Sequence, residues 1–170
     1  MQKIQQKKLL ARILIGLLLF LFPFQAFTED KAYGPEGKRF GVGFYLGEPA
    51  GLTLKGYLTR KFALDGVVGW SFVKEGVALM ADATYDIVEI PTHSSAVSIP
   101  FYLGGGVKIA FGERGRHEDQ TFAAFRVPLG LAFQLTHHPV EFFFEVAPGV
   151  QFAPHGDFDI SGGAGARFYF

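Results

Sequence analysis

The chain of 170 residues contains no cysteine, and this absence removes several classes of protein from consideration. It excludes disulfide bonds, thiol catalysis and a lipoprotein anchor built on an acylated cysteine. The sequence also has no long stretch with helical periodicity. In its place stand 20 phenylalanines and 22 glycines, a combination that is typical of an all-β protein, and the length fits one domain.

An excess of positive charge is absent as well once the first 28 residues are set aside. Those residues hold Lys3, Lys7, Lys8 and Arg12 and no acidic residue. The rest of the chain therefore keeps 12 of the 16 basic residues and all 16 acidic ones, which is a net charge of −4. Because a negative chain repels phosphate groups, we expect no nucleic-acid partner.

The N-terminal segment has the three-part layout of a secretory signal peptide. A basic stretch to Arg12 is followed by an unbroken apolar run over 13–22, which Pro23 ends. A membrane-spanning helix needs about 20 apolar residues, and this run has roughly half that number, which favours a cleaved signal over an uncleaved anchor. We expect a signal peptide over 1–28, whose cleavage point the sequence leaves open, and a flexible periplasmic lead-in over 29–38.

After the lead-in, apolar and polar side chains alternate, which is the period of a β-strand. In 77–87, for example, Val77 and Leu79 lie on one face and Asp82 and Asp86 on the other. The eight expected strands cover 39–47, 51–59, 62–73, 77–87, 99–112, 121–135, 139–153 and 157–170. The turns between them are short, so neighbouring strands should pair as antiparallel hairpins. The strands are long for a globular protein but suit a tilted membrane crossing.

The polar faces of these strands carry acidic and basic residues in equal numbers. They are Arg39, Lys55, Asp65, Asp82, Asp86, Lys108, Arg126, Glu141, Glu145 and Arg167. A closed barrel of eight strands is just wide enough to be filled by side chains, and unpaired charges inside it would be costly. Matched charges therefore predict a filled lumen over 39–170, in which glycines leave room for long arginine and lysine side chains. Bulky apolar residues on every opposite face favour a membrane barrel over a soluble β protein.

The chain ends in a segment, 163–170, that alternates toward a terminal phenylalanine. This ending resembles the signal that the barrel-assembly machinery reads in bacterial outer-membrane proteins, with Phe168 and Phe170 as its apolar positions. Over 39–170 the chain resembles the eight-stranded outer-membrane barrels of the OmpX and OmpA-transmembrane type, and 47–52 is similar to a hairpin of small barrels of that kind. The resemblance implies a location in the bacterial outer membrane, among lipid and lipopolysaccharide, and no particular activity.

No motif points clearly to catalysis, a cofactor or a metal. Outer-membrane lipid A deacylases use a His-x-Ser pair, and here only His93 and Ser95 have that spacing, in a turn expected on the periplasmic side. The segments 117–119 and 155–157 each hold a histidine and an aspartate that could meet as a cation site, but such loop clusters are usually only solvated. The glycines at 104–106 lie inside an expected strand, so they form no phosphate loop.

Pro128 and Pro148 lie inside adjacent expected strands at similar depth. Proline removes a hydrogen-bond donor from the ladder, and a closed barrel has no free edge to accommodate it. Paired prolines of this kind flank the lateral gate of palmitoyl-transferring barrels. By parity Pro128 faces inward and Pro148 outward, so without a bulge only one of the two weakens the seam between their strands.

Three functions stay open at this point. We favour a barrel with a plugged lumen and a structural or surface-interaction role, without enzymatic activity, cofactor or metal. The alternatives are a narrow pore for small solutes and a lipid-modifying enzyme with a lateral gate near Pro128 and Pro148. The oligomeric state is not predicted.

Overall fold

The computed structural model describes residues 33–113 and 119–170 of the chain. The expected signal peptide over 1–28 lies outside the described residues, as do the first four residues of the expected lead-in, 29–32. No helix in the described part is long and apolar enough to cross a membrane.

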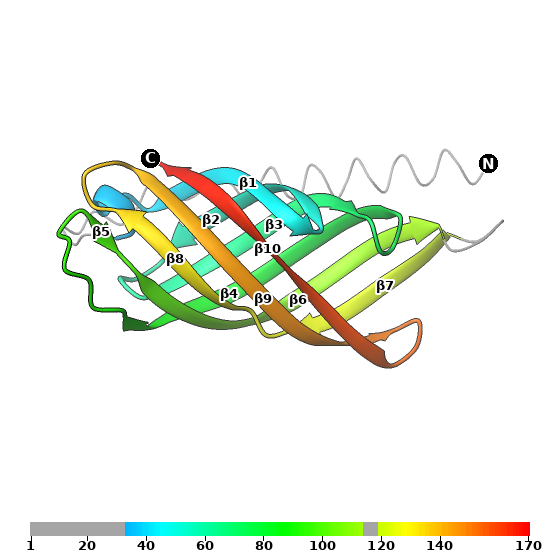
Figure 1. Ribbon diagram of the computed structural model, residues 1–170. Coiled ribbons are helices and arrows are strands. Elements are labelled where there is room, and N and C mark those ends of the chain that lie inside the picture. The colour runs from blue at the N-terminus through cyan, green and yellow to red at the C-terminus, as the bar shows by residue number, and fades with distance from the viewer. Residues whose placement is uncertain (1–32, 114–118) are drawn as a thin grey trace. The chain divides into compact units, whose positions relative to one another are not determined.

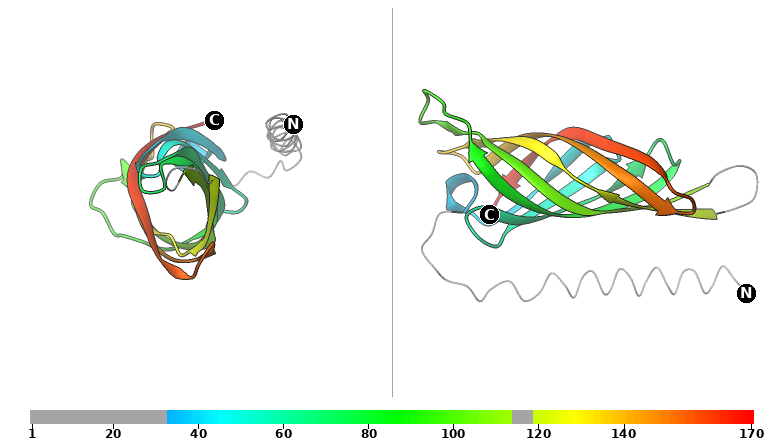
Figure 2. Two further views of the ribbon diagram at one scale, coloured as in Figure 1. Left: turned by 90° about the vertical axis from the view of Figure 1, so that its right-hand side faces the viewer. Right: turned by 90° about the horizontal axis from the view of Figure 1, so that it is seen from below.

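The described strands form one antiparallel sheet that closes on itself (Figures 1 and 2). They are β1 (Phe40–Glu48), β2 (Ala50–Tyr57), β3 (Phe62–Ser71), β4 (Gly76–Glu89), β5 (Val97–Ser98), β6 (Pro100–Glu113), β7 (Asp119–Arg126), β8 (Leu129–Leu135), β9 (Val140–Ala153) and β10 (Asp157–Tyr169). The short β5 leads into β6, and β7 and β8 are two parts of one wall strand along β9. Because β10 pairs with β1, the prediction of an all-β, closed, eight-stranded antiparallel barrel is confirmed.

The two faces of the wall have opposite polarity. Outside, Phe44, Phe125 and Phe158 are 66%, 61% and 68% exposed. Of the charged side chains that the structure describes within strands, only Glu89 and Asp157 are exposed, and both lie at strand ends. The period-2 pattern therefore places apolar rings outside and charges inside, which is the reverse of a soluble protein.

The chain termini distinguish the two ends of the barrel. We call the end where β1 begins and β10 finishes the terminal end, and the end with the β1–β2, β3–β4 and β9–β10 turns the distal end (Figure 1). At the terminal end the N–H of Phe170 donates to the carbonyl of Phe40 at 2.8 Å, and the N–H of Tyr169 donates to the carbonyl of Pro139 at 2.7 Å. The ladder thus continues to the last residue.

Residues 33–38 differ from the flexible lead-in that their composition suggests. Tyr33 and Pro35 are buried, and a single 3-10 turn, η1 (Pro35–Gly37), connects them to β1. The segment is ordered because an aromatic ring and a proline find an apolar seat at the terminal end, which the sequence pattern around them does not reveal.

Candidate functional site

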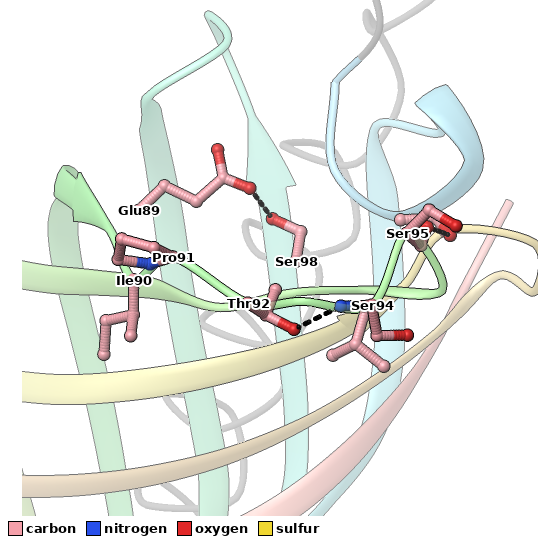
Figure 3. A pocket seen from close by; sticks show the side chains of 9 residues that line it. Glu89, Ile90, Pro91, Thr92, Ser94, Ser95 and Ser98 are labelled. Atoms are coloured by element: carbon pink, nitrogen blue, oxygen red, sulfur yellow. Dashed lines mark hydrogen bonds between the residues drawn. The ribbon is translucent and has the colours of Figure 1, made fainter.

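A hollow of about 430 Å³ lies at the terminal end, lined mainly by the segment that connects β4 to β6 (Figure 3). Four of its five hydroxyl groups make hydrogen bonds to nearby residues of the loop. The hydroxyl of Ser98 donates to Glu89 at 2.8 Å, and Thr92 Oγ1 accepts the N–H of Ser94 at 3.0 Å. Ser95, the only serine with a His-x-Ser spacing, lines this hollow. The hydroxyls of Ser98 and Thr92 thus serve the structure of the loop.

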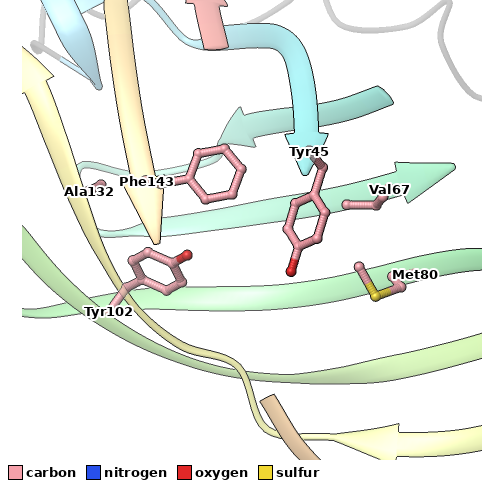
Figure 4. Packing of buried hydrophobic residues seen from close by; sticks show 6 residues of the cluster. All are labelled: Tyr45, Val67, Met80, Tyr102, Ala132 and Phe143. Carbon is pink, nitrogen blue, oxygen red and sulfur yellow. The ribbon is translucent and has the colours of Figure 1, made fainter. Parts of the chain in front are cut away.

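The barrel interior is where the polar chemistry gathers. Figure 4 shows part of its apolar filling, which consists of Tyr45, Val67, Met80, Tyr102, Ala132 and Phe143. Four basic and five acidic side chains are buried with them. These are Lys55, Lys108, Arg126, Arg167, Asp65, Asp82, Glu141, Glu145 and Asp159.

Arg126 is the centre of the middle layer. Its guanidinium lies 2.5 Å from a carboxylate oxygen of Glu145 and 3.3 Å from one of Asp82. Two tyrosine hydroxyls also donate to Glu145, that of Tyr102 at 3.0 Å and that of Tyr45 at 3.5 Å. Charges removed from water need this number of partners to offset their desolvation.

Arg167 is the centre of a second cluster toward the terminal end. Its guanidinium nitrogens lie 2.7 Å from Asp65 and 2.8 Å from Glu141, and two of them also donate to the hydroxyl oxygen of Thr53. Lys55 Nζ lies 3.8 Å from the same Asp65. It also lies 5.0 Å and 4.8 Å from the ring centroids of Tyr57 and Tyr102, so its charge makes cation–π contacts with two aromatic rings.

The carboxylate of Glu141 extends this cluster to the terminal end. It accepts hydrogen bonds from the amide of Gln134 at 2.9 Å and from the hydroxyl of Tyr169 at 3.1 Å. Gln134 also donates to the hydroxyl oxygen of Tyr57 at 2.8 Å, and that hydroxyl donates to Asp86 at 3.5 Å. These bonds join strands from both sides of the barrel.

Toward the distal end, the described residues make fewer polar contacts. Lys108 pairs with Asp159 at 3.1 Å, and Lys74 Nζ donates to the side-chain oxygen of Gln151 at 2.9 Å. Buried Ala78, Ala110 and Phe122 fill the space beside them.

Glu48, in the hairpin between β1 and β2, reaches across to the β3–β4 turn. Its carboxylate accepts the hydroxyl of Ser71 and the backbone N–H groups of Phe72 and Val73, the latter two at 2.9 Å and 3.4 Å. Charge-assisted bonds of this kind join two turns of the distal end.

Eight of the ten residues expected in the lumen are buried inside the barrel. The other two, Arg39 and Asp86, are half-buried near the terminal end. The guanidinium of Arg39 lies over the ring of Tyr33 at 4.0 Å, and Asp86 accepts from Tyr57.

Sequence reasoning missed Asp159 and the four inward tyrosines. Asp159 shares the parity of Arg167 on the same strand, so its position could have been read from the alternation, and it gives the buried set one more acid than base. The tyrosines also have inward parity. They are Tyr45, Tyr57, Tyr102 and Tyr169, each at most 1% exposed.

Several inward glycines make room for aromatic rings rather than for arginine or lysine. A Cβ atom at Gly41 or Gly163 would lie 2.8 Å from the ring of Tyr169 or Tyr45, respectively. At Gly165 it would lie 2.5 Å from the ring of Phe143. The expectation that lumen glycines accommodate long basic side chains is therefore wrong at these positions.

The two prolines interrupt different seams of the wall. Between Arg126 and Leu129 the register against β9 has no inserted residue. The N–H of Val127 therefore donates to the carbonyl of Pro148 at 2.9 Å, while Pro148 has no N–H to donate back. On the side that faces β6, the N–H of Gly104 donates to the carbonyl of Pro128 at 2.8 Å, and Pro128 likewise has no N–H to donate back. Pro148 thus removes a hydrogen bond between β9 and the wall strand formed by β7 and β8. Pro128 removes one between that wall strand and β6.

The remaining residues singled out in the sequence lie on the surface where the structure describes their side chains. Phe168 and Phe170 point outward and are 49% and 64% exposed, on either side of the buried Tyr169. His155 is exposed in the β9–β10 turn, whereas His117 and Glu118, the other half of the cation site considered above, fall outside the residues whose placement is described. Within the described ranges, no group of three His, Cys, Asp or Glu side chains is placed to hold a metal ion.

Comparisons with protein-family models, with curated proteins and with solved structures found no match to this chain.

Proposed function

We propose that the chain is a bacterial outer-membrane β-barrel with a plugged lumen and a structural or surface-interaction role that needs no catalysis. One observation carries the proposal: the wall exposes bulky apolar side chains, while its strand charges are buried or lie near strand ends. Lipid suits such a surface, because a closed barrel leaves no backbone edge unpaired in hydrocarbon. In water the same surface would promote association.

The ends of the outer surface support the same location. Exposed aromatic residues occur near both barrel ends, as expected for the two girdles of a membrane barrel. They are Phe40, Phe142 and Phe168 at the terminal end and Trp70, Phe72 and Phe152 at the distal end. The signal-peptide layout supports export, and the terminal phenylalanine supports recognition by the barrel-assembly machinery. The surroundings would then be lipid and lipopolysaccharide.

The plugged lumen rests on ion pairs between strands that are not neighbours in the wall. These pairs are Arg167–Asp65, Arg126–Asp82 and Lys108–Asp159. Each one links two strands that are separated by at least one other strand, and the hydroxyls of Tyr45 and Tyr102 bind Glu145 beside Arg126. A narrow pore needs a continuous water path, which these contacts oppose.

Cell fractionation tests the location. The mature chain should be recovered in the outer-membrane fraction and should migrate differently on gels before and after heating, because a closed barrel resists detergent until it is heated. Recovery as a soluble periplasmic protein would overturn the proposal.

Planar-bilayer recording tests whether the lumen is closed. The purified protein should give no stable conductance above the leak of the bilayer alone. Stable open channels would overturn the proposal of a plugged lumen and favour a narrow pore for small solutes.

A lipid-modifying enzyme is the second candidate, and the missing ladder bonds at Pro128 and Pro148 favour it. Against it, buried Tyr102 and the buried Arg126–Glu145 pair occupy part of the interior, where a gate would have to admit an acyl chain. Mass spectrometry of lipid A with and without the gene should detect no difference. A modification that disappears in Pro128→Ala and Pro148→Ala variants would establish the gated enzyme instead.

A further inference from the structure

Tyr33 precedes the first wall strand, yet it is only 8% exposed. Its ring belongs to a buried cluster with Tyr57 of β2, Ala63 of β3 and Tyr169 of β10. The guanidinium of Arg39 covers the ring at 4.0 Å from its centroid. A residue outside the wall thus occupies a seat built by three strands.

The local backbone is shaped to bring Tyr33 into this seat. Gly34 has φ 56° and Gly37 has φ 76°, conformations that glycine adopts without strain. A Cβ atom at Gly34 would lie 2.8 Å from the carbonyl of Lys38 and 3.1 Å from the ring of Tyr57. Glycine at 34 is therefore required both by the turn and by the close approach to the seat.

The segment extends from one side of the barrel mouth to the other. Tyr33 contacts β2, β3 and β10, while η1 contacts β8, which lies across the barrel from β2 in the strand order. Pro35, within η1, is buried as well. Beneath the segment lie Tyr57 and Tyr169, the outermost members of the hydrogen-bonded network around Glu141.

We propose that residues 33–38 form a plug that closes the terminal end of the lumen, and that the plug seats only after β10 has closed the barrel. The first part follows from a segment that covers the mouth and separates the charged network from water. The second follows because Tyr169, part of the seat, lies on the last strand. The proposal concerns the folded barrel itself and holds in detergent as well as in a membrane.

The natural absence of cysteine makes an accessibility test direct. Ala63 lies under Tyr33 and is 1% exposed, so Ala63→Cys places a single thiol beneath the plug. Its rate of reaction with a charged maleimide is measured in the refolded, full-length barrel. We expect Tyr33→Ala to raise this rate by about tenfold or more, and Tyr33→Phe to leave it unchanged, because the ring forms the seal.

Two controls keep the test specific. Glu36→Gln changes an exposed side chain of the same segment, and it should leave the labelling rate of the Ala63→Cys barrel unchanged. Ala110→Cys, buried near the distal end, should stay unreactive in the Tyr33→Ala background. Equal reactivity of Ala63→Cys with and without Tyr33→Ala, or a parallel rise at Ala110→Cys, would overturn the plug.

The order of seating is tested by pulse-labelling the Ala63→Cys barrel during refolding. Protection of the thiol should appear together with, or after, the heat-modifiable form that marks a closed barrel. Protection that precedes this form would overturn the dependence of the plug on β10. Either result leaves the membrane location untouched, since fractionation decides that separately.

Discussion

The terminal and distal halves of the lumen are filled by different means. In the terminal half, Arg167 binds two carboxylates and a threonine, and a chain of tyrosine and glutamine bonds surrounds it. In the described part of the distal half, Lys108 has one carboxylate partner, and Ala78, Ala110 and Phe122 form an apolar cluster. A guanidinium has five donors in a fixed plane and can join several walls, whereas an ammonium acts as a point charge. The terminal half should therefore contribute more to stability.

The largest effect is expected from Arg167→Met. The change leaves Asp65 and Glu141 buried without their main counter-charge, which should lower the free energy of unfolding by about 3–5 kcal/mol. Urea titration in detergent, followed by the fluorescence of the single tryptophan, measures it. Arg60→Met, at an exposed turn, is the control. A loss no larger than in that control would remove the difference between the halves.

Lys108→Met should lower the free energy of unfolding by less, about 2 kcal/mol, because it leaves only Asp159 buried without its counter-charge. Removing both partners in Lys108→Met/Asp159→Leu should bring the free energy of unfolding back to within about 1 kcal/mol of the natural chain. The same titration compares the three proteins. If Lys108→Met is as damaging as Arg167→Met, the two halves are equivalent.

Glu48→Gln tests the turns of the distal end. It weakens the charge-assisted bonds to Ser71 and to the backbone of Phe72, at an expected cost of about 1–2 kcal/mol. Protease cleavage in the β3–β4 turn should also become faster. Glu75→Gln, exposed in the same turn, serves as the matched control. Identical cleavage rates in both variants would show that Glu48 does not hold the turn.

The smallest effect is expected from Tyr169→Phe, at about 1 kcal/mol, because it removes one hydrogen bond to Glu141. Glu141 keeps its bonds to Gln134 and Arg167. The outward Tyr85→Phe should be close to neutral in the same urea titration. A cost several times larger for Tyr169→Phe would mean that the hydroxyl organises the whole terminal network.

The fold could be predicted because the patterns that specify it, alternating polarity and short turns, lie between residues close together in the sequence. The alternation in 77–87 recurs along the chain, and short turns leave only antiparallel hairpins, so the strand positions and the inward parity of residues such as Arg126 follow. The same alternation also places Asp159 inside, because it lies between the outward Phe158 and Ile160.

The pairing across the lumen could not be predicted. Arg167 reaches Asp65 only because the stagger of the closed wall brings β10 and β3 to the same level, and no local pattern encodes that stagger. The same holds for Tyr33, whose seat exists only after three distant strands have come together.

The shared partners inside the barrel also constrain how this sequence can diverge. An outward residue such as Leu46, 70% exposed, can be exchanged for another apolar residue by a single mutation, since few neighbours must adapt. Arg167 cannot, because its loss is tolerated only if Asp65 and Glu141 change with it. The outer surface should therefore drift one position at a time, while the interior changes in linked groups, and covariation between β3, β9 and β10 should be its lasting signature among descendants of this chain.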